Sequence, residues 1–112
     1  MPGDGGFRTQ FTHVIDVAPT ILEAAGLPTP QMVNGTAQRP MDGVSMLYAA
    51  KDPAAAGQHE TQYFEMFGNR GIYHKGWYAR VIHNPTWEPQ PRTSIADGKW
   101  ELYDTRTDFS LI

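Results

Sequence analysis

Few side chains in this sequence have types and spacings that could do chemistry. His13 and Asp16 lie three residues apart at the start of an apolar, helix-like segment. At that spacing an imidazole and a carboxylate could touch, or could share a metal ion. Asp is also a favoured residue for capping a helix N-terminus. We therefore expect Asp16 to cap the helix, with His13 beside it.

Two further histidines, His59 and His74, have equally plain explanations. His59, Glu60 and Glu65 form a loose cluster beside an alanine-rich linker, where we expect a solvated loop. His74 and Lys75 fall at a presumed hairpin turn, where exposure is the ordinary outcome. None of these groups has the spacing of an established catalytic or metal site.

Aromatic and charged residues of the second half could also bind a ligand. Glu65 and Arg70 are spaced to form an ion pair across a strand end. Tryptophan faces can stack on sugars, and the sequence has three, at positions 77, 87 and 100. Trp77 and Trp100 follow an alternating pattern that favours core packing. Trp87, in a proline-rich loop, is the best candidate for a sugar contact.

Several catalytic sets are missing from the sequence. There is no cysteine, so no disulfide, thiol nucleophile or Cys-ligated metal site can form. We find no Ser-His-Asp spacing, no His-Glu-x-x-His and no phosphate-binding loop. We therefore expect no catalytic, cofactor-binding or metal-binding residue in this chain.

Composition limits the class of protein. The 112 residues suffice for one domain at most, and 40% are hydrophobic. The net charge of −3 gives no general attraction for nucleic acid or anionic lipid. No apolar run can span a bilayer, and residues 1–10 do not resemble a signal peptide. We expect a soluble, loop-rich protein without nucleic-acid or membrane partners.

The first half predicts one clear helix. Apolar residues at helical spacing indicate a helix over residues 16–25, with Pro19 in its first turn and Gly26 just past its end. Prolines and turn residues predict a loop over 27–43, and a short helical turn follows at 45–48. The helix is apolar on more than one side, which suggests burial all round.

The second half predicts a small antiparallel sheet. The expected strands cover residues 61–67, 71–74, 77–83 and 99–103. Residues 75–76 form the turn of a hairpin, and an acidic turn follows at 104–108. One helix and one small sheet leave apolar faces uncovered, so the chain looks like part of a larger domain.

Four ordered segments resemble the sulfatase family. The segment HVIDVAPTILEAAGLP (13–28) resembles a sulfatase helix with the pattern Val-x-Asp-x-x-Pro-Thr followed by Leu-x-x-Ala-Gly. The segment MDGVSM (41–46) resembles the Leu-Asp-Gly-x-Ser-Leu element that follows it. The segments YFEMFGNRGIYHKGWYARV (63–81) and WELYDTRTDFS (100–110) resemble the C-terminal subdomain. The order of these segments agrees with that of the family over about residues 5–110. Their amino-acid sequence resembles that of bacterial arylsulfatases most.

This resemblance implies a fold and an activity. Type I sulfatases have an alkaline-phosphatase-like α/β fold and hydrolyse sulfate esters. A formylglycine, made within Cys/Ser-x-Pro-x-Arg, attacks sulfur beside a calcium ion that Asp and Asn side chains hold. Residues 1–60 would then belong to the edge of the large α/β domain, and residues 61–112 to the C-terminal antiparallel subdomain. The helix face formed by Val17, Ile21 and Leu22 would be exposed in the isolated chain.

None of the family's functional residues can be carried over. Ser45, Ser94 and Ser110 are not followed by x-Pro-x-Arg, and the calcium ligands of the family lie upstream of the matching segments. We expect a partial arylsulfatase, cut at both ends, that is inactive alone. Calcium, formylglycine and the sulfate-ester substrate would belong to its parent, in a bacterial cytoplasm or periplasm. A non-enzymatic carbohydrate-binding or interaction module, or a functionless truncated product, stays open as an alternative.

Overall fold

The chain forms two compact units that divide between His59 and Glu60. Their structure comes from a computed structural model, which describes residues 5–83, 87 and 94–111. No helix among the described residues is long and apolar enough to cross a bilayer.

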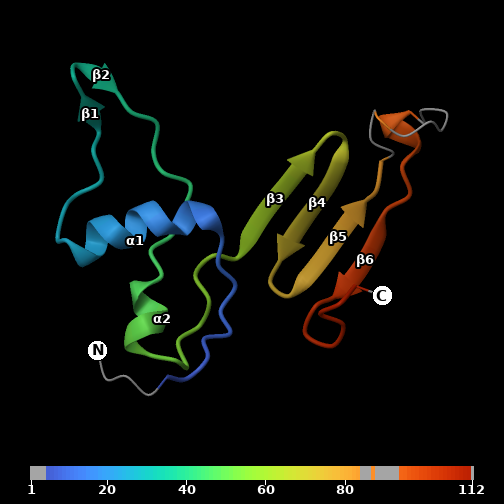
Figure 1. The fold of residues 1–112 in the computed structure, drawn as a ribbon, viewed down its shortest axis with the longest axis horizontal. Coiled ribbons are helices and arrows are strands. Elements are labelled where there is room, and N and C mark those ends of the chain that lie inside the picture. Colours follow the sequence, from blue (N-terminus) through green and yellow to red (C-terminus); the bar gives the residue numbers. More distant parts are fainter. Residues whose placement is uncertain (1–4, 84–86, 88–93, 112) are drawn as a thin grey trace. The chain divides into compact units, whose positions relative to one another are not determined.

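The first unit is built on helix α1 (Figure 1). Its elements are η1 (Val14–Asp16), α1 (Val17–Ala24), β1 (Met32–Val33), β2 (Thr36–Ala37) and α2 (Leu47–Lys51). Helix α1 packs against α2, which contains the buried Ala49. The α1 segment agrees with the predicted helix except at its start, where Val14–Asp16 form a 3₁₀ turn.

The end of α1 is fixed by local hydrogen bonds. The amide of Gly26 donates to the carbonyl of Glu23 over 3.1 Å, and that of Leu27 donates to the carbonyl of Leu22 over 2.9 Å. This pair of bonds is the Schellman motif, in which a residue with positive φ closes the helix. Gly26 has a φ of 66°, as the predicted helix end requires.

Three predictions for the first unit need correction. Residues 27–43 are not a loop throughout, because Met32–Val33 and Thr36–Ala37 pair as a short antiparallel hairpin. The predicted helical turn at 45–48 lies later, at Leu47–Lys51. Burial of α1 on all sides is also wrong, because none of its residues is buried. Val17 and Ile21 are exposed, as expected for the isolated chain, whereas Leu22 is half-buried.

The second unit is a four-stranded antiparallel sheet in the order β3-β4-β5-β6. Its elements are β3 (Thr61–Met66), β4 (Asn69–His74), β5 (Trp77–Val81), η2 (Ile95–Asp97) and β6 (Glu101–Asp104). The predicted strands are thus confirmed with shifted ends. The fold as a whole is mixed helix and sheet, which agrees with the expected class at that coarse level.

Two-residue turns join the first three strands. Phe67-Gly68 links β3 to β4, and Lys75-Gly76 links β4 to β5. All four residues have positive φ, the requirement of the type I′ turn that matches strand twist. The predicted hairpin at 75–76 is therefore confirmed.

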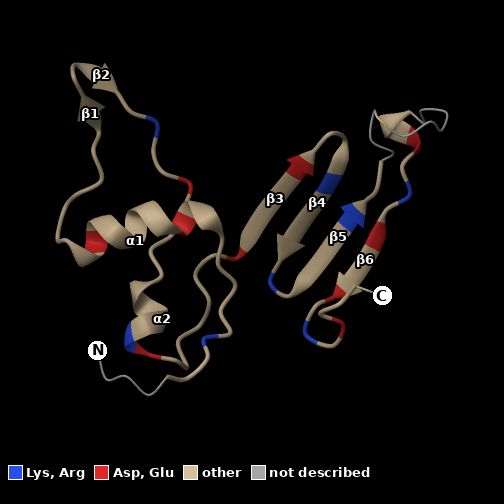
Figure 2. Cartoon of the chain, in the orientation of Figure 1, with Lys and Arg blue, Asp and Glu red and all other residues tan. Residues whose placement is uncertain are grey.

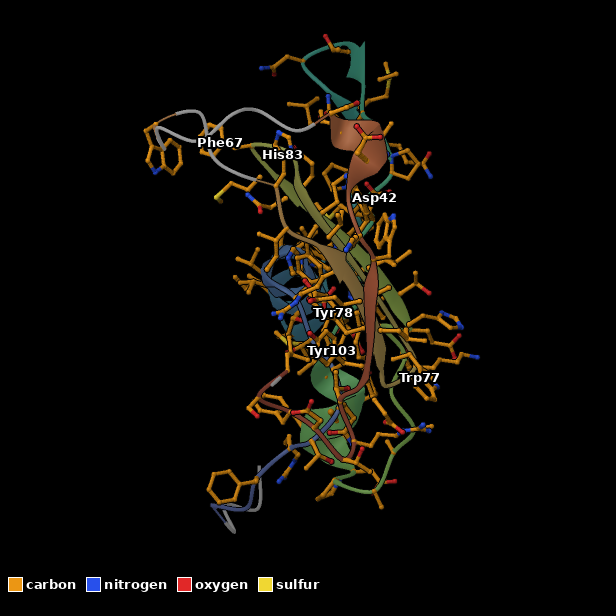
Figure 3. All side chains as sticks on the ribbon, turned by 90° about the vertical axis from the view of Figure 1, so that its right-hand side faces the viewer. Asp42, Phe67, Trp77, Tyr78, His83 and Tyr103 are labelled. Atoms are coloured by element: carbon orange, nitrogen blue, oxygen red, sulfur yellow. The ribbon has the colours of Figure 1, made fainter. Side chains whose placement is uncertain are left out.

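The register divides the side chains between two faces of the sheet. Tyr73, Tyr78 and Tyr103 are cross-strand partners in one row. Trp77 precedes Tyr78 on the same strand and therefore points to the opposite face, as Figure 3 shows. Among the described residues only Ala49 and Val81 are buried hydrophobic residues. The core of each unit is accordingly small.

The prediction that Trp77 and Trp100 pack in a core is wrong. Trp77 is 43% exposed and Trp100 is 54% exposed. Alternation along a strand identifies side chains that share a face, but it does not say which face becomes covered.

Candidate functional site

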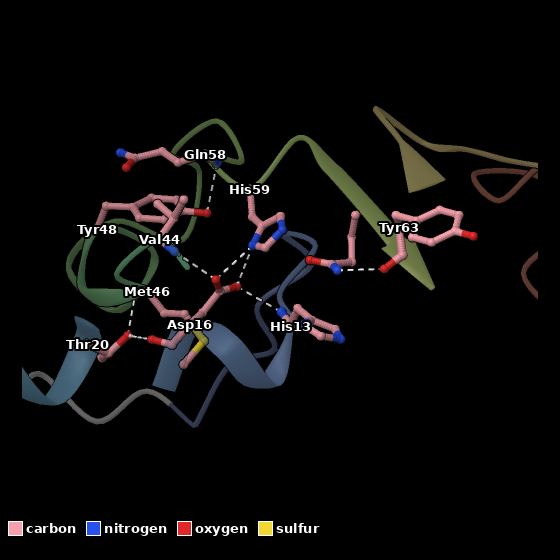
Figure 4. A network of polar contacts seen from close by, with 10 residues as sticks. His13, Asp16, Thr20, Val44, Met46, Tyr48, Gln58, His59 and Tyr63 are labelled. Atoms are coloured by element: carbon pink, nitrogen blue, oxygen red, sulfur yellow. Dashed lines mark hydrogen bonds and ion pairs between the residues drawn. The ribbon is translucent and has the colours of Figure 1, made fainter. Parts of the chain in front are cut away.

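The most organised polar site of the first unit surrounds the carboxylate of Asp16 (Figure 4). Asp16 is fully buried. One oxygen accepts the amide of Val44 over 2.8 Å, and the other accepts the amide of His13 over 2.8 Å. The ring nitrogen Nδ1 of His59 lies 2.7 Å and 2.8 Å from the two oxygens. Every one of these contacts places a nitrogen against the carboxylate.

The His59 contact defines the tautomer of the ring. An ionised carboxylate can only accept hydrogen bonds, so Nδ1 must carry a proton and donate it. The His59 side chain is only 6% exposed, and the ring of Phe11 stands edge-on to it at 5.5 Å between centroids. The pair is thus buried, hydrogen-bonded and packed, the condition under which a buried charge is tolerated.

The electrostatics of Asp16 reflect two opposing effects. Burial by itself raises the pKa of the carboxyl group, because it disfavours the charged form. The hydrogen bonds from the Val44 and His13 amides and from His59 act in the opposite direction. They prevail, so the pKa of Asp16 lies below its ordinary value and the group is ionised at neutral pH.

A side chain of α1, that of Thr20, extends the network. The hydroxyl of Thr20 donates to the carbonyl of Asp16 over 2.6 Å and accepts the amide of Met46 over 2.8 Å. Asp16 and Thr20, one helical turn apart, therefore hold alternate amides of the segment that precedes α2, those of Val44 and Met46. This is a clamp between two segments that lie 26 to 28 residues apart in sequence.

Gly43 lets the clamped segment approach closely. A Cβ atom at this position would collide with the carbonyl group of Ile15. The absence of a side chain therefore allows residues 43–46 to lie directly against η1. The neighbouring Asp42 pairs instead with Arg39 over 3.2 Å, with both side chains exposed.

In the second unit a polar cluster lies on the tyrosine face. Arg80 donates to Glu101 over 2.8 Å and to the hydroxyl of Tyr103 over 3.0 Å. The Tyr103 hydroxyl also donates to Glu101 over 2.9 Å. The hydrogen bond from Arg80 lowers the pKa of Glu101, and the bond to Glu101 raises the pKa of Tyr103. Arg80 and Tyr103 are half-buried and Glu101 is exposed, so solvent still screens the charges in part.

The opposite face carries two arginine–tryptophan pairs. The guanidinium of Arg106 lies 5.2 Å from the ring centre of Trp77, and that of Arg70 lies 5.6 Å from the ring centre of Trp100. Arg106 is also bound by Asp104 through two contacts of 2.6 and 2.7 Å. These arrangements are cation–π contacts at the surface. Across the sheet, the outer strands β3 and β6 each contain a glutamate, and the inner strands β4 and β5 each contain an arginine (Figure 2).

Most sequence candidates have separate partners. Instead of forming a cluster, Glu60 pairs with Lys75 over 3.0 Å, and Glu65 accepts the amide of Gly68. The prediction of a solvated loop is wrong for His59, which is buried against Asp16. His74 and Lys75 are exposed at their turn, as predicted.

Two predicted contacts, the ion pair between Glu65 and Arg70 and the helix cap by Asp16, do not form. Glu65 and Arg70 are cross-strand partners, but Arg70 donates to the carbonyl of Ile95 over 2.8 Å instead of forming the expected ion pair. Asp16 precedes α1, yet its side chain does not cap that helix and binds His13, Val44 and His59 instead. Trp87 is 68% exposed and meets the ring of Phe67 edge-on.

The described residues contain no group of three His, Cys, Asp or Glu side chains that could hold a metal ion. Sequence spacing missed the Asp16–His59 pair, because the two residues lie 43 positions apart. The only sign of this pair in the sequence was a charged residue, Asp16, in a segment otherwise rich in apolar residues.

No model of a known protein family matches the chain, and no curated protein matches it.

Proposed function

We propose that this chain is a non-catalytic part of a sulfatase, an enzyme that hydrolyses sulfate esters. The observation that supports this most is the clamp between Asp16 and Thr20 on one side and Val44 and Met46 on the other. It joins the Val-x-Asp-x-x-Pro-Thr segment to the Asp-Gly-x-Ser segment, which are the two elements that resemble consecutive parts of the sulfatase family. The aspartate and threonine of the first pattern and the glycine of the second, Gly43, thereby have a structural purpose.

The proposal extends to the finer fold. The unit around α1 would form the edge of an alkaline-phosphatase-like α/β domain, and the four-stranded sheet would be the C-terminal subdomain. The exposed Val17 and Ile21 on α1 support this, because an exposed apolar helix face is normally covered by a neighbouring element. In this view residues beyond this chain supply that cover.

Catalysis would depend on residues outside the chain. In the family, calcium and formylglycine supply charge stabilisation and the nucleophile. Asp16 does not fit as a calcium ligand, because both oxygens of its buried carboxylate already accept hydrogen bonds. The chain has no cysteine, and none of its serines lies in Ser-x-Pro-x-Arg. Its residues would contribute framework rather than reactive atoms.

A carbohydrate-binding module is the competing proposal. It is favoured by the exposure of Trp87, whose ring edge meets Phe67 at 5.4 Å between centroids. Titration with sulfated sugars, followed by tryptophan fluorescence, tests it. A saturable change in fluorescence would support carbohydrate binding by this chain. Fluorescence that does not change would exclude it.

The decisive test of the sulfatase proposal is the coding DNA upstream of this chain. We expect a Cys/Ser-x-Pro-x-Arg motif in the same or a shifted frame. Its absence from all three frames, up to the preceding gene, would overturn the proposal. A purified chain of this sequence should also fail to hydrolyse nitrophenyl sulfate. Turnover above a mock-purified control would contradict the non-catalytic role.

A further inference from the structure

The hairpin β1–β2 presents an asparagine–glycine turn to solvent. Asn34 and Gly35 have φ values of 49° and 78° and connect Val33 to its partner Thr36. Every residue from 23 to 42 is exposed, so no packed layer shields the turn. A Cβ atom added to Gly35 would meet no atom within 4 Å. Water therefore reaches the turn from all sides.

The local bonding leaves both reacting groups available. Among the described residues, the Asn34 side chain makes no hydrogen bond, and the Gly35 amide donates to no backbone carbonyl. The strands contribute two residues each, and a two-stranded hairpin of this kind is only marginally stable in water. The turn can therefore open and rotate the Asn34 backbone at small cost.

We propose that Asn34 is a site of spontaneous modification, in which its side-chain amide is converted to a carboxylate through a cyclic imide. The Gly35 amide nitrogen attacks Cγ of Asn34, and a new C–N bond forms. The Cγ–Nδ2 bond breaks, and ammonia leaves with the proton from the Gly35 nitrogen. Water then opens either carbonyl of the ring and yields aspartate or isoaspartate. Only water is consumed and only ammonia is released.

The other two asparagines provide the contrast. The amide of Asn69 donates to the carbonyl of Met66 over 3.1 Å, and its oxygen accepts the amide of His83 over 2.9 Å. Asn69 is followed by Arg70, whose side chain crowds the attacking nitrogen, whereas glycine has none. Asn84 is followed by proline, which has no N–H to lose. The chemistry therefore selects Asn34.

The product changes both charge and backbone. Aspartate at position 34 adds one negative charge to an already acidic chain. Isoaspartate moves the backbone through the side-chain carbon and inserts one extra main-chain atom into the two-residue turn. That insertion breaks the pairing of Val33 with Thr36. The hairpin would open as the protein ages.

Incubation of the full chain at neutral and mildly alkaline pH, followed by peptide mapping, tests the proposal. Labelling with an isoaspartyl methyltransferase distinguishes isoaspartate from aspartate. We expect both acids at Asn34, at a rate within about tenfold of that in a free Met32–Ala37 peptide, which corresponds to about 1.4 kcal/mol of protection. Asn69 should stay an amide in the same digest.

The matched variant is Asn34→Gln, which lengthens the side chain and disfavours ring closure. It should stay unmodified over the same period. Acid formation at position 34 of this variant at the wild-type rate would show direct amide hydrolysis and overturn the cyclic route. Equal conversion of Asn34 and Asn69, or an unmodified Asn34 when the free peptide has converted, would overturn the site itself.

Discussion

The Nδ1 atom of His59 lies almost equally far from both carboxylate oxygens of Asp16, at 2.7 Å and 2.8 Å. Asp16, just before α1, is thereby joined to His59, the last residue of the first unit. The Val44 amide binds the same carboxylate from a third segment. One buried charge thus organises three parts of the chain.

Replacing Asp16 by Asn should destabilise the first unit by about 3 kcal/mol, because charge-assisted bonds are lost and one buried donor faces the new NH₂ group. Urea unfolding followed by far-ultraviolet circular dichroism, and exchange of the Val44 amide, measure this. Tryptophan fluorescence should not change, because all three tryptophans follow Glu60. Asp42→Asn, in an exposed pair, should cost no more than about 0.5 kcal/mol. Equal losses in both variants would contradict the clamp.

The first unit should lose stability in acid. Hydrogen bonds hold the pKa of Asp16 below its ordinary value of 3.8, so the unfolded chain takes up the proton first as the pH falls. The stabilisation is therefore complete above that ordinary value and is lost as the pH drops through the folded pKa. Amide exchange at Val44 against pH measures it. The Asn variant should lack this dependence, and identical pH profiles for wild type and Asp16→Asn would refute the assignment.

Thr20→Val should weaken the link between α1 and the segment before α2. The substitution keeps the shape of the side chain but removes the acceptor for the Met46 amide. We expect a loss of about 1–2 kcal/mol, the cost of leaving a part-buried donor without its bond. Denaturant unfolding of the first unit measures this, with Thr29→Val in the exposed loop as the control. A loss no larger than that of the control would show that the hydroxyl bridge contributes nothing.

Gly71→Ala should destabilise the sheet. A Cβ at Gly71 would collide with the hydroxyl of Tyr78, whose ring crosses this position to meet Phe64 edge-on at 6.1 Å between centroids. Moving the ring costs about 1–3 kcal/mol, as overpacking usually does. Tryptophan fluorescence in urea reports this loss. Gly57→Ala, which meets no atom within 4 Å, should leave the sheet unchanged.

The isolated chain should associate through α1. Ile21 is 61% exposed, and Ile21→Lys should reduce concentration-dependent association in sedimentation velocity. Ala18→Lys adds the same charge on the same helix without removing a large apolar side chain, and it should have a smaller effect. A wild-type chain that stays monomeric at every concentration and melts in one sharp transition would contradict this prediction.

The sequence by itself determined the local elements. Apolar spacing located α1, Gly26 marked its end, and the lysine–glycine pair at 75–76 marked the turn of a hairpin. These features depend on neighbours within a few residues, and their free energies are set by backbone geometry and local hydrogen bonds. Strand ends were predicted less accurately, because they depend on the partner strand.

Only the tertiary structure decided which side chains meet. His59 looked like a loop histidine, yet it is buried against Asp16, 43 positions away. Trp77 and Trp100 alternate like core residues, yet each is exposed with an arginine over its ring. Periodicity is a property of one segment. Burial of a side chain and its contacts depend on a second segment that packs against the first. Packing of the segments decides which group binds a buried charge. It also decides which aromatic rings stay exposed to water.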